Sequence, residues 1–384
     1  MARSAPRGDP AGRARIAFLN NQGLDAIGGG VTILRHLVAA LAPAHDVTVL
    51  SHDQPGAAPD GVRQIVLERP ASPRGPLWRV APLHRARQLA RSNVPPALRE
   101  ADLVVALDPH FAGMLRRVKP RRLVYLSLSC VPRQEWFAAS GGQAGLRFLQ
   151  YAWLERRMAR LAGRTVVASE THAAELRRWE AMPGLRPLVL HPAFPAESAP
   201  APRRENATVT VLSAGRLERG KHLGAVLDLA AQLTDLPCRF VIAGGGPELG
   251  RLQARAAAVG VSDRVTFAGP VASLGPLLAE AGLFLHTSRY ESFGIAPFEA
   301  MRAGVPPVCA KGDVIGCREI MQDGVDSVFV DFGRPGAVAA LRHLVLDRPA
   351  RERMGAAARA TATRVLAQNY AARFGATLDE MLAR

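Results

Sequence analysis

Short runs of apolar residues recur along the whole chain and are separated by longer amphipathic segments. The runs are apolar almost throughout, as expected for strands that are buried on both faces of a parallel sheet. The longer segments, for example 31–41, 222–233 and 248–259, have the spacing of helices. We therefore expect strands at 15–19, 47–50, 65–67, 103–106, 123–126 and 165–168, and again at 208–212, 240–243, 265–267, 283–285, 307–309 and 327–330.

This alternation of strand and helix occurs twice, on either side of a proline-rich stretch. The pattern predicts an α/β protein with two doubly wound, Rossmann-like domains that face each other. Ligands bind outside the carboxyl ends of the strands in such sheets, so we expect a cleft between the domains to hold the site. The expected parts are a disordered leader at 1–14, a first domain at 15–192, a linker at 193–206, a second domain at 207–365, and a C-terminal helix at 366–384, for which packing on the first domain is one option.

Basic residues are concentrated in the first half of the chain. The formal net charge of the 384 residues is +16, from 49 Lys and Arg against 33 Asp and Glu. Nearly all of the basic residues are arginines, a bias that a GC-rich genome alone can produce. However, residues 1–200 carry a net charge of +12 and residues 201–384 carry +4, whereas codon bias acts on both halves alike. The asymmetry favours a basic face on the first domain.

The basic character peaks between Arg69 and Arg99, where the chain has seven arginines and no Asp or Glu. Between positions 77 and 91 the arginines interleave with Trp, Leu and Val, which is typical of an interfacial helix on an anionic membrane. The alternative is a solvated helix with its apolar stripe in the domain core. Nucleic acid ranks below a membrane as a partner because the chain has no nucleic-acid-binding motif.

The sequence also bears on the compartment. It contains no apolar run of the ~18–20 residues that a membrane span requires, and its first fifteen residues lack the apolar core of a signal peptide. The four cysteines, Cys130, Cys238, Cys309 and Cys317, form no CxxC motif, which argues against a zinc site and a disulfide framework. We expect a cytoplasmic protein, with peripheral attachment to the inner face of the membrane as an option.

Two carboxylates stand at the start of one predicted helix in the second half. Glu291 follows the strand at 283–285 after a short loop, and Phe293-Gly294 then opens a helix that carries Glu299. Backbone N–H groups at a helix start receive anions such as phosphate, and carboxylates accept hydrogen bonds from the vicinal hydroxyls of a sugar or ribose. The alternative is an acidic pair that only complements the helix dipole.

Two cations stand on the loop after the first strand of the second half. Arg216 and Lys221 are five residues apart on a glycine-containing loop that leads into a helix. A guanidinium fork and an ammonium point charge suit a diphosphate, although a solvated basic turn is the alternative. The loop is not a Walker A motif, and the glycines 244–246 do not form the GxGxxG of a nicotinamide site.

In combination these segments resemble the retaining glycosyltransferases of family 4, which have the GT-B fold. The matching motifs occur in order along most of the chain. They are Gly28-Gly-Gly30, Gly215-Arg216 with Lys221, Gly244-Gly-Gly-Pro-Glu248, Phe267-Ala-Gly269, and Glu291-x7-Glu299 with Ala303-Gly-Val-Pro306.

The resemblance implies a role for each motif toward a nucleotide-sugar donor. Arg216 and Lys221 would bind the donor diphosphate, Glu299 would hold the ribose, and Glu291 would hold the sugar ring. The remaining donor contacts would come from the backbone at Phe293, Gly294 and Ile295 for phosphate, from Gly269 and Val271 beside the base, and from Gly29 and Gly30, which let the first domain approach the phosphates and the acceptor.

The resemblance also implies a reaction without a cofactor or a bound metal ion. The donor is itself a substrate, and the chain contains no DxD motif to hold a metal. The phrase Glu-Ser-Phe-Gly-Ile is similar to that of mannosyltransferases acting on phosphatidylinositol and lipid-linked acceptors. This similarity favours GDP-mannose over UDP-sugars as the donor. The acceptor is expected to be a glycan or a lipid-linked hydroxyl.

The first half departs from the family pattern. Many relatives carry a His at the end of a central strand, whereas the stretch 123–130 has none; His110 is the nearest substitute, and a loop histidine without a role is the alternative. His222 also follows Lys221 where relatives often have Gly. A sugar-nucleotide epimerase of the same fold and a non-catalytic relative that binds nucleotide sugars therefore remain alternatives.

Overall fold

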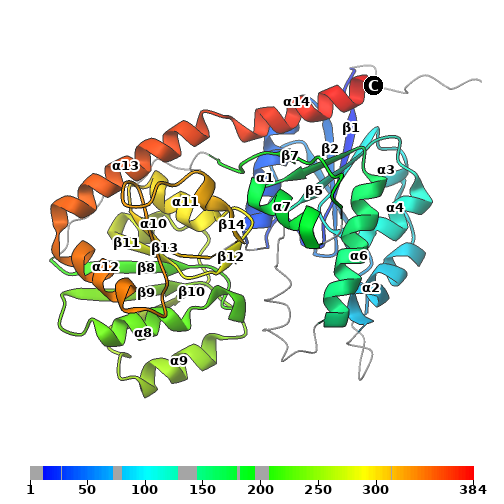
Figure 1. Ribbon diagram of the computed structural model, residues 1–384. Coiled ribbons are helices and arrows are strands. Elements are labelled where there is room, and N and C mark those ends of the chain that lie inside the picture. The colour runs from blue at the N-terminus through cyan, green and yellow to red at the C-terminus, as the bar shows by residue number, and fades with distance from the viewer. Residues whose placement is uncertain are drawn as a thin grey trace, which may run out of the picture. The chain divides into compact units, whose positions relative to one another are not determined.

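The computed structural model describes residues 12–26, 28–71, 80–128, 145–179, 182–194, 207–312 and 314–384. The chain forms two compact units, each built on one parallel sheet (Figure 1). The described residues up to His191, apart from Gly28 and Gly29, and the segment Tyr370–Arg384 belong to the first unit. Pro192–Asn369 form the second unit, to which Gly28 and Gly29 are also assigned. How the two units face each other stays a prediction.

The first unit contains a seven-stranded sheet in the order β3-β2-β1-β4-β5-β6-β7. Helices α2, α4 and α6 pack against one another. Helix α14 lies beside α1: a Cβ built on Gly375 of α14 would lie 3.5 Å from a methyl carbon of Leu41 at the end of α1. The strands are β1 (Arg15–Leu19), β2 (Asp46–Ser51), β3 (Val62–Val66), β4 (Leu103–Ala106), β5 (Leu123–Ser127), β6 (Arg164–Val167) and β7 (Leu188–Val189). The helices are α1 (Gly29–Leu41), α2 (Ala81–Arg91), α3 (Pro96–Arg99), the 3₁₀ turn η2 (Pro109–Phe111), α4 (Ala112–Val118), α6 (Gly145–Leu161), α7 (Glu170–Trp179) and α14 (Tyr370–Ala383).

The second unit contains a six-stranded sheet in the order β10-β9-β8-β11-β13-β15, and a separate two-stranded ladder of β12 with β14. The strands are β8 (Val209–Ala214), β9 (Cys238–Ala243), β10 (Val265–Gly269), β11 (Ala281–His286), β12 (Tyr290–Glu291), β13 (Pro307–Ala310), β14 (Val314–Ile315) and β15 (Val328–Val330). The helices are η3 (Arg219–Lys221), α8 (Gly224–Gln232), α9 (Leu249–Ala258), α10 (Gly275–Glu280), α11 (Ile295–Arg302), η4 (Gly316–Glu319), α12 (Pro335–Leu346) and α13 (Arg348–Leu366).

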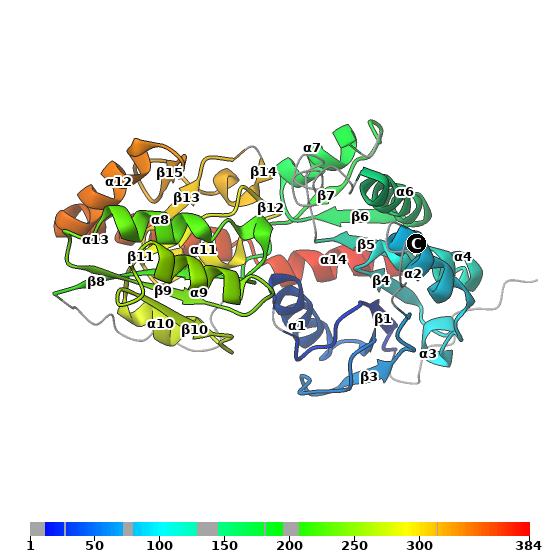
Figure 2. The ribbon, with the colours of Figure 1, turned by 90° about the horizontal axis from the view of Figure 1, so that it is seen from below.

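The strand order of both sheets reverses at one point. Neighbouring strands run parallel in both sheets. When the main strands of each unit are numbered along the chain, their order in the sheet is 3-2-1-4-5-6, so later strands are added on both sides of the first. The reversal lies between β1 and β4 in the first unit and between β8 and β11 in the second (Figure 2). Ligands bind at this switch point in doubly wound sheets, so the topology directs attention to the loops after β8 and β11.

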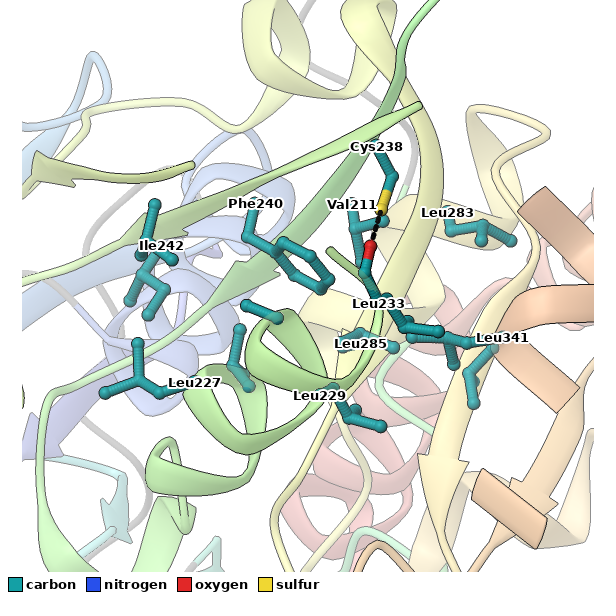
Figure 3. Close-up of a cluster of buried hydrophobic side chains, with 14 of the residues drawn as sticks. Val211, Leu227, Leu229, Leu233, Cys238, Phe240, Ile242, Leu283, Leu285 and Leu341 are labelled. Carbon is teal, nitrogen blue, oxygen red and sulfur yellow. Dashed lines mark hydrogen bonds between the residues drawn. The ribbon is translucent and has the colours of Figure 1, made fainter. Parts of the chain in front are cut away.

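The core of the second unit explains why its strands are apolar throughout. Phe240, Leu285 and Leu227 are buried between the sheet and helices α8 and α12, together with Leu341 (Figure 3). Each large apolar side chain buried in this way contributes roughly 1.5–3 kcal/mol relative to exposure. Cys238 shares the cluster, and its Sγ lies 3.9 Å from the carbonyl oxygen of Leu233.

All twelve predicted strands are present, with ends that shift by up to three residues. The short strands β7, β12 and β14 are additional. Helix α13 continues to Leu366, and the next helix, which belongs to the first unit, begins at Tyr370. Most of the predicted leader and linker, together with Cys130, lie outside the described residues.

The described part of the basic stretch bears on the two interpretations of the helix α2. Part of that stretch, 72–79, lies outside the described residues. Within α2 the apolar residues Pro82, Ala86 and Leu89 are buried, and Arg87 and Arg91 are exposed. The apolar stripe of α2 therefore faces the core of the first unit, which is the alternative interpretation. Across the part of the chain that the structure describes, no helix combines the length and hydropathy of a membrane-spanning segment.

Candidate functional site

The carboxyl ends of β8 and β11 hold the side chains that the sequence singled out. The loop after β8 carries Arg216 and continues into the turn η3, which ends at Lys221. The segment after β11 carries Glu291 on β12, and α11 begins four residues later at Ile295. The strand order brings these two loops to the switch point of the sheet, although they are far apart in sequence.

Lys221 and Glu291 form an ion pair across the two loops. Lys221 Nζ lies 2.5 Å from Glu291 Oε2, and both side chains are mostly buried, at 27% and 24% exposure. The hydroxyl of Thr287 donates a hydrogen bond of 2.6 Å to the carbonyl oxygen of Lys221. Because Thr287 directly follows β11, this bond ties the end of η3 to the segment that carries Glu291.

A buried imidazole lies behind this pair. His286, the last residue of β11, has its Nε2 3.8 Å from Glu291 Oε2, and this nitrogen has no hydrogen-bond partner among the described residues. The pKa of His286 is lowered to about 4, chiefly by burial and to a smaller extent by the charge of Lys221, against the opposing effect of Glu291. His286 is therefore neutral at physiological pH. Sequence reasoning missed it, although it is the one ionisable side chain within the apolar run of β11.

The charge state of Glu291 depends on its neighbours. Burial by itself would raise the pKa of Glu291. The ammonium of Lys221, the imidazole of His286 and the guanidinium of Arg216 lower it by more, so the pKa of Glu291 lies below its usual value. Glu291 is thus a carboxylate, able to accept hydrogen bonds from hydroxyl groups. Arg216 is exposed and lies 3.2 Å from the carboxylate of Glu218.

A backbone ladder and a side-chain contact flank the Glu291 segment. The ladder of β12 with β14 pairs Tyr290 with Val314 and Glu291 with Ile315. The hydroxyl of Tyr290 also approaches Gly220 in the turn η3 so closely that a Cβ at that position would lie 1.9 Å from the oxygen. A side chain at this position would therefore require Tyr290 to shift.

At the start of α11, main-chain groups rather than side chains are available to a ligand. Phe293 is buried, and its ring lies 5.9 Å from that of Phe298, so only its main chain is available to a ligand. Gly294 caps the helix with φ +100°, and Ile295 is half-buried. Glu299 is half-buried on α11, one turn beyond the start. The predicted residues of this segment therefore lie on the loop and helix that follow β11.

The glycine loops after β8, β9 and β10 interlock. The amide of Gly215 donates to Ala243 O at 3.0 Å, and the amide of Gly244 donates to Gly269 O at 2.7 Å. A Cβ on Gly244 would lie 1.9 Å from the carbonyl oxygen of Gly215. Val271 is half-buried against the cluster around Leu212. The loops bearing Arg216 and Gly269 are thus fixed to each other through backbone contacts.

The predicted residues of the first half of the chain follow two central strands of the first sheet. Gly29 and Gly30 begin α1 after β1. His110 follows β4 in η2 and is buried, with Nδ1 2.6 Å from Asp108 Oδ1. Burial would raise the pKa of Asp108, but hydrogen bonds and charge from His110 lower it below its usual value. His110 is therefore a fixed, buried member of an Asp–His pair rather than a loose loop residue.

A second imidazole lies at the end of β5, where the sequence itself has no histidine. Nε2 of the buried His172, on α7, is 3.3 Å from the hydroxyl of Ser127. Sequence reasoning missed this contact because the two residues are 45 positions apart. The end of the central strand thus has an imidazole supplied by a neighbouring helix.

Comparisons with known proteins find matches for both halves of the chain. Residues 27–197 match the model described as Glycosyltransferase Family 4, and residues 197–361 match Glycosyl transferases group 1. An alpha-D-kanosaminyltransferase of Streptomyces kanamyceticus is 31% identical over 220 residues, covering 53% of this chain and 56% of that protein. A GDP-mannose-dependent phosphatidylinositol dimannoside mannosyltransferase of Mycobacterium tuberculosis is 32% identical over 39% of each chain. This chain thus spans about half or less of these curated relatives.

Solved structures resemble the whole fold. Sucrose-phosphate synthase of Thermosynechococcus elongatus aligns with a TM-score of 0.79 at 19% identity, covering 97% of this chain and 100% of that one. The Anabaena HepE protein in complex with UDP and glucose aligns with a TM-score of 0.72 at 19% identity, covering 96% and 100%. The two-domain α/β architecture is the GT-B fold. None of these four proteins is an epimerase by name, so they give no support to that alternative.

Proposed function

The two halves of the chain belong to the glycosyltransferases, family 4 and group 1, and from this premise we propose that it transfers a sugar from a nucleotide diphosphate sugar to a hydroxyl acceptor with retention. The Lys221–Glu291 pair at the switch point carries the proposal. It puts a cation and a carboxylate beside the start of α11, which suits a donor with a diphosphate at one end and sugar hydroxyls at the other.

Each donor group has a residue assigned to it in this proposal. Arg216 and Lys221 neutralise the diphosphate, and the backbone at Phe293, Gly294 and Ile295 adds N–H donors. Glu291 accepts hydrogen bonds from the sugar ring and Glu299 from the ribose. Gly269 and Val271 border the base, and Gly29 and Gly30 leave room for the phosphates.

In the proposed reaction, the acceptor oxygen forms a bond to the anomeric carbon as the bond from that carbon to the diphosphate oxygen breaks. The hydroxyl proton passes to the departing phosphate oxygen, and the new bond forms on the same face of the sugar. The cations and the α11 backbone stabilise the leaving group. No metal ion is needed in this scheme. His110 is proposed to line the acceptor side.

Two donor classes have support. The Glu-Ser-Phe-Gly-Ile segment and the similarity to a GDP-mannose-dependent enzyme favour GDP-mannose. The fold similarity to a protein bound to UDP and glucose makes UDP-glucose the second candidate. We propose a cytoplasmic enzyme with a glycan or lipid-linked acceptor; a lipid-linked acceptor would place it at the inner face of the membrane.

The purified chain should first be tested against a panel of nucleotide sugars, with transfer to glycan and lipid-linked acceptors followed by mass spectrometry. We expect transfer from GDP-mannose, with the same anomeric configuration in product and donor, and unchanged turnover after dialysis against EDTA. An inverted product or strict dependence on added Mg²⁺ would contradict the mechanism. Binding of nucleotide sugars without any turnover would favour a non-catalytic relative.

A further inference from the structure

Helix α6 presents a stripe of large apolar side chains to solvent. Leu146, Leu149 and Trp153 are 50%, 56% and 44% exposed, whereas Phe148 and Ala152 between them are buried. Positions three and four residues apart lie on one face of a helix, so the three exposed side chains form a continuous row. Contiguous exposed apolar groups on a soluble domain mark an interaction surface.

The same stripe becomes cationic toward the C-terminal end of the helix. The guanidinium of Arg157 lies 5.0 Å from the centroid of the Trp153 ring. Arg160, one further turn along, is exposed. An aromatic ring with a cation above it, next to protruding leucines, combines apolar and cationic groups in the way that interfacial helices do.

The surrounding helices carry the same sign of charge. Helices α2, α4 and α6 lie side by side (Figures 1 and 2) and together have nine arginines and one carboxylate. That carboxylate, Glu155, is buried and accepts a hydrogen bond from Tyr125. Helices α1, α7 and α14 of the same unit have four arginines and four carboxylates. Codon bias acts equally on all six helices, so it does not account for this difference.

We propose that the outer stripe of α6 docks the protein on an anionic lipid bilayer. Leu146, Leu149 and Trp153 enter the boundary between headgroups and acyl chains, and the arginines of α2, α4 and α6 contact the anionic headgroups. The apolar contact thus comes from α6 and not from the buried stripe of α2. The inference rests on the membrane location proposed above, but not on the donor chemistry.

The full chain should be cosedimented, without donor or acceptor, with vesicles of phosphatidylcholine alone and of phosphatidylcholine with phosphatidylglycerol. We expect binding to the anionic vesicles only, and its loss at high salt because the charges are screened. Leu149→Glu should abolish binding, and Arg160→Ala should weaken it about fivefold. Leu346→Glu, a matched change at an exposed leucine of the second unit, should leave it intact.

A second readout places Trp153 itself at the membrane. Vesicles with brominated lipid should quench tryptophan emission of the wild type, and Trp153→Phe should remove that quenching. GDP affinity of the same variants should not change, which separates this inference from the donor site. Equal or negligible binding to both vesicle types would overturn the proposal. A dimer that Leu149→Glu dissociates, without vesicle binding, would also overturn it and assign the stripe to a second copy of the chain.

Discussion

Lys221 and Glu291 are 70 residues apart in sequence and meet at 2.5 Å between Nζ and Oε2. The cation assigned to the diphosphate therefore also holds the carboxylate assigned to the sugar. Removing either partner leaves the other charge mostly buried without its counter-ion, which destabilises a protein more than loss of an exposed pair does.

We predict a measurable coupling between these two residues. A double-mutant cycle of Lys221→Met and Glu291→Gln, followed by urea unfolding at pH 7.5, should give an interaction free energy of about 1–2 kcal/mol. The exposed pair of Arg342 with Asp235 is the control, with N–O distances of 2.5 and 2.9 Å, and should give a smaller coupling. Equal coupling in both cycles would show that burial adds nothing to the Lys221–Glu291 pair.

Replacing the two glutamates of the Glu-x7-Glu motif should have different effects on turnover and on nucleotide binding. Glu291→Ala should lower kcat and kcat/KM together by about 10²–10³, with nucleotide affinity nearly unchanged, because its proposed contact is to the transferring sugar. Glu299→Ala should weaken nucleotide binding by about tenfold or more, since a hydrogen bond to a charged group is lost. Initial rates and titration calorimetry measure the two effects. Near-wild-type turnover in both variants would contradict the site assignment.

His286 should make stability fall with pH below the usual pKa of histidine. The folded pKa of about 4 lies below the ordinary 6.5, so the unfolded chain binds more protons in this window. The contribution of His286 is present above pH 6.5 and is lost as pH falls through 4, by at most ~3 kcal/mol. His286→Asn should flatten the dependence of the unfolding free energy on pH between 6.5 and 4. The exposed His343→Asn serves as control, and identical slopes in both variants would refute the prediction.

The interlocked loops predict a strong asymmetry between two glycine substitutions. Gly244→Ala puts a methyl carbon against the backbone oxygen of Gly215, which cannot move away as a side chain can, and should destabilise the protein by roughly 3 kcal/mol. Gly250→Ala, in α9 with nothing near its added carbon, should be neutral or up to ~1 kcal/mol more stable. Thermal unfolding of both variants tests this. A Gly244→Ala protein as stable as the wild type would show that the loops separate freely.

The main strands of both sheets could be predicted from the sequence because they are buried on both faces. Each run such as Leu103–Ala106 is apolar at every position, and that signal is local. The strands β12 and β14 are two residues each and depend on backbone pairing between distant segments, so no pattern marks them. The predicted site residues of the second unit lie at the carboxyl ends of its strands or on the segments that follow them, but the roles assigned to them stay predictions.

The side chains that the sequence missed depend on the folded structure in two different ways. His172 contacts Ser127 only after folding brings together residues 45 positions apart. His286 is close to Glu291 in sequence, but its burial beside that carboxylate is visible only in the folded chain. The apolar face of α2, for which the sequence left two interpretations open, has a related explanation. Amphipathic spacing in α2 shows that one face is apolar, but only the packing of α2 against α4 and α6 decides that this face is buried.

The position of α14 has a consequence for how the protein is made. This helix belongs to the first unit, where Phe374 and Leu378 are fully buried and the carboxylate of Asp379 lies 3.5 Å from His45. The ribosome must therefore complete the whole second unit before it supplies the last helix of the first. At 5–20 residues per second this interval lasts on the order of ten to forty seconds. During that time the first unit waits on the ribosome with the binding surface for α14 uncovered, which makes the nascent chain a client for chaperones that shield apolar surfaces.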